Sequence, residues 1–233
     1  MGHWPTRYYT LLSSFPALPR LQQAKVLPIS RERLMGRLTM LKEEDAEVVN
    51  QLWNYFAYER QPLDRTDEEV VAFYNTMMRE VLQPTLRAII EFGMNQRTIV
   101  AGLRRRHRGL PAPRPGLIWG GGQWAGHIER HWSDADFNLT TVFPWVPEIR
   151  RFLESNETLS LERKLKDLSW SYLDYLAMGP HFSFDALLVY IAKWSLLNQW
   201  LLHDESKAAE RFETLTAEML VGHDQIFQAA MSV

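Results

Sequence analysis

The sequence of 233 residues contains no cysteine. This absence excludes disulfide bonds, thiolate catalysis and every metal or iron–sulfur site that uses cysteine ligands. An excess of charge of one sign is also lacking, because the 26 basic and 28 acidic residues give a formal net charge of only -2. Such a chain does not supply the general phosphate neutralisation on which sequence-independent nucleic-acid binding depends. A local basic patch remains compatible with this balance.

Long uninterrupted apolar runs are scarce as well. The best candidate for a membrane span, residues 184–202, contains Asp185, Lys193, Asn198 and Gln199, which favours a buried amphipathic helix over a transmembrane segment. The first residues lack a charged lead followed by a long apolar core, so no secretory signal is expected. Hydrophobic residues make up 46% of the sequence, a proportion typical of folded globular proteins. We therefore expect a cytoplasmic protein.

Alternation of apolar and polar residues, the pattern of strands, is nearly absent, and apolar residues recur at helical spacing instead. Residues 5–28 are expected to form an irregular, proline-rich lead. Ser30 is a candidate N-cap for a first helix, and Thr66 with Glu69 forms a capping-box pattern that opens a later one. Pro84 lies inside the helical pattern, so we expect a break or kink there and a new helix from that residue. The predicted fold class is all-α, a multi-helix bundle. Its other helices are expected at about residues 43–59, 84–107, 123–132, 147–154, 159–178, 183–202 and 206–231.

One segment interrupts the helical pattern more clearly than any other. Residues 108–122 contain three prolines and five glycines, which break helices and favour turns. We interpret this segment as a Pro/Gly-rich connector. It would join an N-terminal helical half, residues 1–107 with the irregular lead, to a C-terminal helical half, residues 123–233.

Few residues suggest catalysis or metal binding. His127 and His131 lie four residues apart, a spacing that can hold a metal ion on one helical face, but Glu129 points elsewhere and no third ligand is evident. The glycines of IWGGGQWAG lack the Lys-Ser/Thr of a phosphate-binding loop and are interpreted as a connector between two packing tryptophans. We expect no catalytic residue, no cofactor, no bound metal and no enzymatic activity. A small helical metal-binding protein or enzyme using His127 and His131 is the alternative.

The basic run NQRTIVAGLRRRHRGLPAPRPG, residues 95–116, contains six arginines and no acidic residue. On a helical wheel the arginines do not form one stripe, because Arg97, Arg104 and Arg108 share one flank and Arg105 lies on another. A separate row, predicted to be a structural polar seam against another helix with Gly102 allowing close approach, contains Glu91, Asn95 and Thr98. Basic residues near a helix carboxyl end complement its dipole. We expect the arginines to meet an acidic protein surface, with a nucleic-acid-binding module as the alternative; they are Arg97, Arg104, Arg105, Arg106 and Arg108.

These residues carry a resemblance to a known family. The segment EFGMNQRTIVAGLRRRHRG resembles one that recurs in the C-type central-stalk subunit of V/A-type ATPases (the d-type in eukaryotes), with Glu91 and Asn95 at its acidic and Asn positions. The later segment FSFDALLVYIAKWSLLNQW is similar to a second one, with Tyr190 and Lys193 as its Tyr–x–x–Lys. RYYTLLSSFPALP, FNLTTVFPW and LSLERKLKDLSW resemble a bacterial family of unassigned function that is encoded beside V/A-type ATPase genes.

The resemblance implies a non-catalytic subunit or assembly component of a bacterial V/A-type ATPase, with a role in ion transport. Its fold would resemble part of the funnel that the C-type subunit forms, and two related helical halves would be compatible with the two similar segments. Its expected partners are the central-stalk subunits and the membrane rotor ring, with no nucleic acid. The protein would lie on the cytoplasmic side of the inner membrane, held there through protein contacts alone. The chain is shorter than the C-type subunit, and Gln199 and Trp200 replace the signal expected in its second segment, which argues against full threefold symmetry.

Overall fold

The computed structural model describes residues 6–59, 65–114 and 116–202, and within these residues it contains helices and no strand. The predicted all-α class is therefore confirmed. Residues 184–202 are also helical, whereas the helix expected at 206–231 lies outside the described residues. The labelled helices are α1 (Thr6–Ser14), η1 (Leu21–Gln23), α2 (Arg31–Leu38), α3 (Glu43–Glu59), α4 (Asp67–Glu80), α5 (Pro84–His107), α6 (Ala125–Arg130), α7 (Val146–Glu154) and α8 (Thr158–Leu176).

Local capping explains where several helices begin. The Ser30 side chain accepts a hydrogen bond from the Arg33 backbone N–H at the start of α2. Thr66 and Glu69 form the reciprocal capping box at the start of α4. Pro84 occupies the first turn of α5, where its missing N–H and fixed φ cost nothing. These sequence signals predicted the starts of α2, α4 and α5 correctly.

The irregular lead predicted for residues 5–28 is wrong in part, because α1 and the short 3-10 helix η1 lie within it. The reason is tertiary packing. Leu11 is fully buried, and the Phe15 ring stacks on Tyr190 with ring centroids 4.6 Å apart. The Tyr8 ring contacts Phe184. The apolar side chains of this segment are therefore ordered by the helix at 184–202, far away in the sequence.

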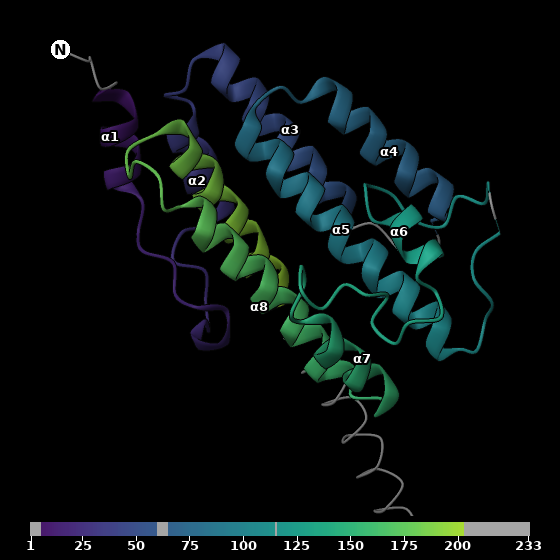
Figure 1. Cartoon of the computed structure of the whole chain (residues 1–233). Helices are drawn as coiled ribbons and strands as arrows, with labels where there is room; N and C mark the ends of the chain where they lie inside the picture. Colours follow the sequence, from purple (N-terminus) through teal and green to yellow (C-terminus); the bar gives the residue numbers. More distant parts are fainter. Residues whose placement is uncertain (1–5, 60–64, 115, 203–233) are drawn as a thin grey trace, which may run out of the picture.

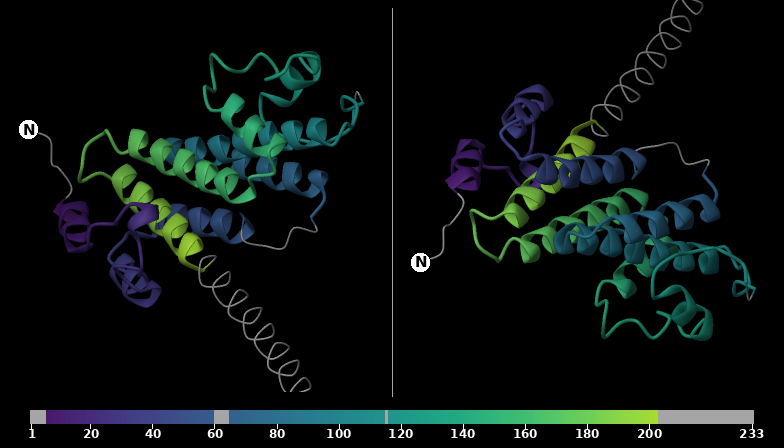
Figure 2. Two further views of the ribbon diagram at one scale, coloured as in Figure 1. Left: turned by 90° about the horizontal axis from the view of Figure 1, so that it is seen from below. Right: turned by 90° about the horizontal axis from the view of Figure 1, so that it is seen from above.

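Helix α5 occupies the middle of the bundle, where it contacts α3, α4, α6, α7 and α8. In Figure 1, the axes of α3, α4, α5 and α8 lie roughly parallel, and the chain direction alternates between α3, α4 and α5. Both views of Figure 2 show α1 and α2 on one side of the helix at 184–202 and α8 on its other side. No helix in the described part of the chain combines the length and apolarity needed to cross a membrane.

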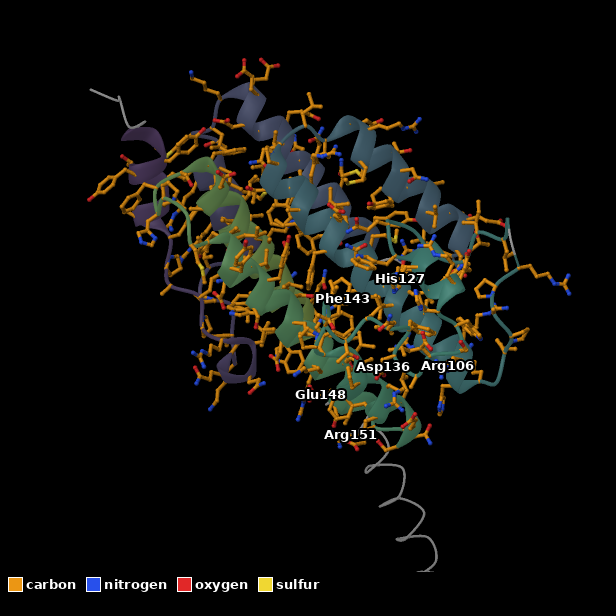
Figure 3. All side chains as sticks on the ribbon, in the orientation of Figure 1. Arg106, His127, Asp136, Phe143, Glu148 and Arg151 are labelled. Carbon is orange, nitrogen blue, oxygen red and sulfur yellow. The ribbon has the colours of Figure 1, made fainter. Side chains whose placement is uncertain are left out.

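Two apolar clusters form the core. The first joins residues of α2, α3 and the beginning of α5 to the helix at 184–202. The second joins the later part of α5, from Ile99 to Leu103, to α6, α7 and the start of α8. At the edge of the second cluster, Arg150 donates to Asp136 at 2.8 Å and Lys164 pairs with Glu148 at 2.6 Å; Figure 3 labels the two acids.

The clusters do not follow the predicted division at residues 108–122. Helix α5 contributes to both of them, and so does α8, through Leu173 in the first cluster and Leu161 in the second. The helix at 184–202, assigned to the C-terminal half, packs with the N-terminal helices. The division into halves over 1–107 and 123–233 stays a prediction, and the packing of the described residues is continuous across it.

Candidate functional site

The basic end of α5 is a consequence of its sequence pattern. Gln83 caps the start of the helix by accepting from the Leu86 N–H, and Ile99, Val100 and Leu103 are buried along one face. The last turn carries Arg104, Arg105, Arg106 and His107, where positive charge complements the carbonyl end of the helix dipole. Gly109 then ends the helix with a φ of +70°, which glycine adopts without strain.

A groove of about 650 Å³ lies against this part of α5. Helix α5 forms one wall and α8 the other, while α3 and the helix at 184–202 contribute to its base. The two walls are joined where the Gln96 side chain donates to the Leu165 carbonyl at 3.1 Å. Of the basic residues predicted to bind a partner, four line this groove, which we call the arginine groove; they are Arg97, Arg104, Arg105 and Arg108.

Three of these arginines lack a fixed partner. Among the described residues, no hydrogen bond or ion pair engages the guanidinium of Arg97, Arg104 or Arg108. Arg104 and Arg108 are exposed. Neighbouring side chains reduce the solvation of the Arg104 guanidinium and lower its pKa from the usual range, and the charges of Arg108 and Arg97 lower it further. Arginine stays protonated at neutral pH in spite of such a shift, so the groove wall carries a row of mutually repelling positive charges.

The other two predicted arginines contact this chain itself. Arg105 lines the groove, and its Nε donates to the Pro111 carbonyl at 3.0 Å. Arg106 donates to the Asp134 carbonyl, and its guanidinium lies 5.5 Å from the centre of the Phe137 ring. Figure 3 shows Arg106 near the end of α5, toward the α6 and α7 region. Arg106 therefore holds the loop after α6 and is not a residue of the groove.

The predicted polar seam is divided between two sets of neighbours. The Glu91 carboxylate raises the pKa of Tyr74 on α4 and of Tyr172 on α8, in each case adding to the larger effect of burial. Thr98 is almost fully buried, and its hydroxyl donates to the Gly121 carbonyl at 2.9 Å and accepts from the Gly121 N–H at 3.0 Å. At Glu91 the row therefore faces other helices, as predicted for the polar seam. At Thr98 it faces a loop instead of a helix.

The glycine-rich segment is packed closely against α5. A Cβ added at Gly120 would lie 2.7 Å from the Thr98 methyl, and one at Gly122 would lie 2.8 Å from Asn95 Oδ1. Asn95 is buried, and its Oδ1 has no hydrogen-bond partner in the described residues. Trp119 before the glycines is buried and donates to Glu129 at 2.8 Å. The segment that the sequence suggested as a connector is thus packed closely against α5.

Gly102 permits the close approach that was predicted for it. A Cβ at this position would lie 3.3 Å from side-chain atoms of both Ile128 and Phe137. These residues belong to α6 and to the segment after it, and both are fully buried. The small residue therefore sets how closely α6 packs on α5.

The two histidines lie on α6 and at its end. His127 Nε2 is 3.0 Å from the Phe137 carbonyl oxygen, His131 Nδ1 is 3.0 Å from the Asp134 carboxylate, and the two rings stack with centroids 4.4 Å apart. In the described ranges, no group of three or more His, Asp or Glu side chains is placed to hold a metal ion. Each histidine therefore contacts a residue of the segment that follows α6.

The Tyr–x–x–Lys pair joins separate parts of the bundle. The Tyr190 hydroxyl donates to the Pro16 carbonyl at 2.9 Å, and Lys193 forms an ion pair with Asp174 of α8. Lys193 also lies 5.1 Å from the centre of the Trp170 ring. This pair therefore holds the N-terminal segment and α8 against the helix at 184–202.

Sequence reasoning missed the groove residues that lie outside α5. Lys166 of α8 lines the groove and donates to Gln199 at 3.0 Å. Arg65, before α4, also lines it; its guanidinium stacks 4.0 Å from the centre of the Tyr58 ring, and its Nε and Nη1 are buried without a hydrogen-bond partner among the described residues. Helical periodicity shows that each helix has a polar flank, but it does not show which flanks face one another.

Residues 18–223 match the model of a family described as protein of unknown function (DUF2764). The match covers most of the chain, including every helix from η1 to α8 and the arginine groove between them. No curated protein and no solved structure matches the chain.

Proposed function

The chain belongs to the DUF2764 family, and we propose that this member is a non-catalytic subunit or assembly component of a V/A-type ATPase. In this role it links the rotary central stalk to the membrane ring, at the cytoplasmic side of the membrane, through protein contacts alone. The observation that carries a docking role is the row of unpaired arginines on the wall of the arginine groove, Arg97, Arg104 and Arg108.

The identity of the complex rests on the sequence. Glu91, Asn95 and the basic end of α5 resemble a segment of the C-type central-stalk subunit, and Tyr190 with Lys193 resembles a second one. In this structure the arginines of that end other than Arg106 line the groove, the charge of Glu91 acts on tyrosines of two neighbouring helices, and Tyr190 joins distant segments. Residues with structural and docking roles are the ones that a family of docking subunits would share.

The architecture suits a part that transmits force. Helix α5 has 24 residues, so it is about 36 Å long at 1.5 Å per residue, and it is buried in both apolar clusters. A helix that is packed along its whole length moves with its neighbours as one body, because close-packed interiors deform little. A load applied at one end of α5 is therefore carried to the other.

Affinity purification from the native host tests the proposal. We expect stalk or ring subunits of a V/A-type ATPase to co-purify with the tagged protein under mild conditions. Replacing Arg97, Arg104 and Arg108 by Glu should reduce their recovery strongly. If no stalk or ring subunit co-purifies with the unmodified protein, the proposal is contradicted.

A matched control separates the groove from charge in general. Arg33, Arg130 and Arg163 are exposed and lie outside the groove. Their replacement by Glu changes the net charge by the same amount and should leave the recovery of partner subunits unchanged. An equal loss with both triple variants would mean that net charge, and not the groove, determines the association.

A further inference from the structure

We infer that the arginine groove binds an acidic amphipathic helix of a partner protein, with the helix lying along α5. This inference rests on the docking role proposed above and specifies what that surface recognises. It depends on three observations: the charge of the groove, the composition of its base, and the spacing of the arginines along α5.

The groove is strongly basic within an acidic chain. Six basic residues and two acidic ones line it, which gives its lining a formal charge of +4, whereas the whole chain carries -2. The cations come from three separate parts of the chain. Arg65 precedes α4, Lys166 lies on α8, and the row Arg97, Arg104 and Arg108 lies on α5 and its C-cap. Concentrating like charge in a concave surface is unfavourable in the free protein and favourable once an acidic partner binds.

The buried residues that line the groove form its base, and they are apolar. They include Ile89 and Val100 of α5, Leu173 of α8 and Leu196 of the helix at 184–202. Phe92 and Tyr172, whose rings stack with centroids 4.1 Å apart, lie at the same surface. A ligand that fills the groove must therefore present apolar side chains to its base and carboxylates to its wall, which is the composition of an amphipathic helix.

The spacing of the arginines matches such a helix. Arg97, Arg104 and Arg108 lie seven and four residues apart on one face of α5, so the row extends about 16 Å at 1.5 Å per residue. Carboxylates at the same spacing on a partner helix would meet all three. A small free anion would reach only part of this row.

Nucleic acid fits the groove less well. Asp67 and Glu162 line it together with the arginines, and their carboxylates would repel a phosphate backbone. The apolar base offers no partner to phosphates or sugars, and Arg105 already donates to the Pro111 carbonyl. Sequence-independent binding to nucleic acid depends on neutralising phosphates and makes no use of such a base.

The test uses the full-length protein and a labelled helical peptide of about five turns, with Glu at relative positions 1, 5, 8 and 12 and Leu along the adjacent face. Fluorescence anisotropy is expected to show binding that weakens with salt. The Arg97, Arg104 and Arg108 to Glu variant should bind about 10- to 100-fold more weakly, because each attraction becomes a repulsion. The control variant at Arg33, Arg130 and Arg163 should bind as the unmodified protein does.

Two peptide controls make the result independent of how the variants fold. A peptide with the four Glu replaced by Lys should not bind the unmodified protein. A peptide of the same composition in scrambled order, without a helical apolar face, should bind at least about tenfold more weakly, since it loses the apolar contacts. Equal binding of the original and scrambled peptides would overturn the inference of a helical ligand.

Other occupants are distinguished in the same assay. Equal or tighter binding of duplex or single-stranded oligonucleotides, lost in the arginine variant, would overturn the inference in favour of nucleic acid. Residues 203–233 of this chain contain six acidic and two basic residues, so a full-length variant with Asp204, Glu205, Glu210 and Glu213 changed to amides is included. If only this variant binds the peptide, the chain's own acidic segment is the occupant and the inference fails; unchanged affinity supports a partner helix.

The inference and the proposed function fail separately. If the peptide binds in the groove but no V/A-type ATPase subunit co-purifies, the proposed function is wrong and the groove specificity stands. If the subunits co-purify and neither the peptide nor the arginine variant shows an effect, the function stands and the inference is wrong.

Discussion

A side chain at Gly122 would be unfavourable for two reasons, the left-handed backbone conformation and a close contact with Asn95. The φ of Gly122 is +75°, and the position of a Cβ would lie 2.8 Å from the Oδ1 of buried Asn95. Gly109 shares the first property, with φ +70°, but a Cβ there would meet no atom within 4 Å. A comparison of substitutions at these two glycines therefore separates the cost of backbone strain from the cost of a packing clash.

Replacing Gly122 by Ala is expected to lower the free energy of unfolding by about 2–4 kcal/mol, from the left-handed backbone and the clash together. Gly109→Ala should cost only about 1–2 kcal/mol, from the backbone alone. Urea unfolding followed by circular dichroism measures both. Equal losses would show that the glycine-rich segment is not fitted against Asn95.

The ionisation of Tyr190 links pH to the stability of the fold. Burial raises the pKa of Tyr190 from 10.0 to about 12, and Arg37 opposes this shift. The folded chain thus holds the phenol proton more tightly than the unfolded chain does. Its contribution to stability is complete below about pH 10 and is lost as the pH rises through about 12.

Tyr190→Phe is therefore expected to act in two ways. At neutral pH it should lower the free energy of unfolding by about 1 kcal/mol, because the hydrogen bond to the Pro16 carbonyl is lost. Between pH 10 and 12 its stability should fall less steeply than that of the unmodified protein. Urea unfolding at several alkaline pH values tests this, and parallel curves would contradict it.

Among the helices, two caps of the same type differ in strength. At the start of α4 the Thr66 hydroxyl accepts from the Glu69 N–H at 3.1 Å, and the Glu69 carboxylate accepts from the Thr66 N–H at 2.8 Å. At the start of α2 the Ser30 hydroxyl accepts from the Arg33 N–H at 3.4 Å. The reciprocal pair satisfies two backbone donors with good geometry, and the single bond is long.

We expect Thr66→Ala to lower the free energy of unfolding by about 1 kcal/mol. Ser30→Ala should lower it by less, and Glu69→Gln should retain most of the box because the amide oxygen also accepts. Thermal unfolding of the three variants ranks them. A larger loss for Ser30→Ala than for Thr66→Ala would be inconsistent with the two geometries.

Helix boundaries were predictable where the signal is local. Caps and prolines gave the starts of α2, α4 and α5, since these residues act on the backbone next to them. Helix α1 was missed because its order depends on contacts with residues about 175 positions later, such as that between Tyr8 and Phe184. No pattern within residues 5–28 contains that information.

The candidate site was predictable only in part, for the same reason. The wheel placed Arg97, Arg104 and Arg108 on one flank, and the structure brings them to one groove. The wheel did not indicate that Lys166 and Arg65 complete the groove or that Arg106 holds the segment around Phe137. Those assignments depend on how helices pair, which a single sequence does not encode in its periodicity.

For the molecule as a whole, α5 and α8 contribute to both apolar clusters, so we expect the two clusters to unfold together. Leu103 belongs to the second cluster and is 3% exposed. Loss of the Leu103 side chain should weaken the packing of α5. The same helix contributes Leu86, Ile89 and Ile90 to the first cluster. Neither cluster is complete without the helices of the other.

Leu103→Ala is expected to cost about 2–5 kcal/mol and to lower amide hydrogen-exchange protection in residues 187–197 of the first cluster as well as around α7. Leu82→Ala, at a side chain that is 84% exposed, should change the stability by less than about 0.5 kcal/mol. Hydrogen exchange measured by mass spectrometry tests both variants. Loss of protection confined to the second cluster would instead indicate two independent units, as the predicted division implies.

The contacts between the first helices and the helix at 184–202 have a consequence for synthesis. The Trp194 indole donates to the Ile29 carbonyl and Tyr190 to the Pro16 carbonyl, across 165 and 174 positions of the chain. A ribosome adding about 5–20 residues per second needs roughly ten seconds or more to supply these partners. During that interval the Phe15 ring lacks the Tyr190 ring on which it stacks. The nascent chain therefore completes the packing of its first helix only after its last described one has been made.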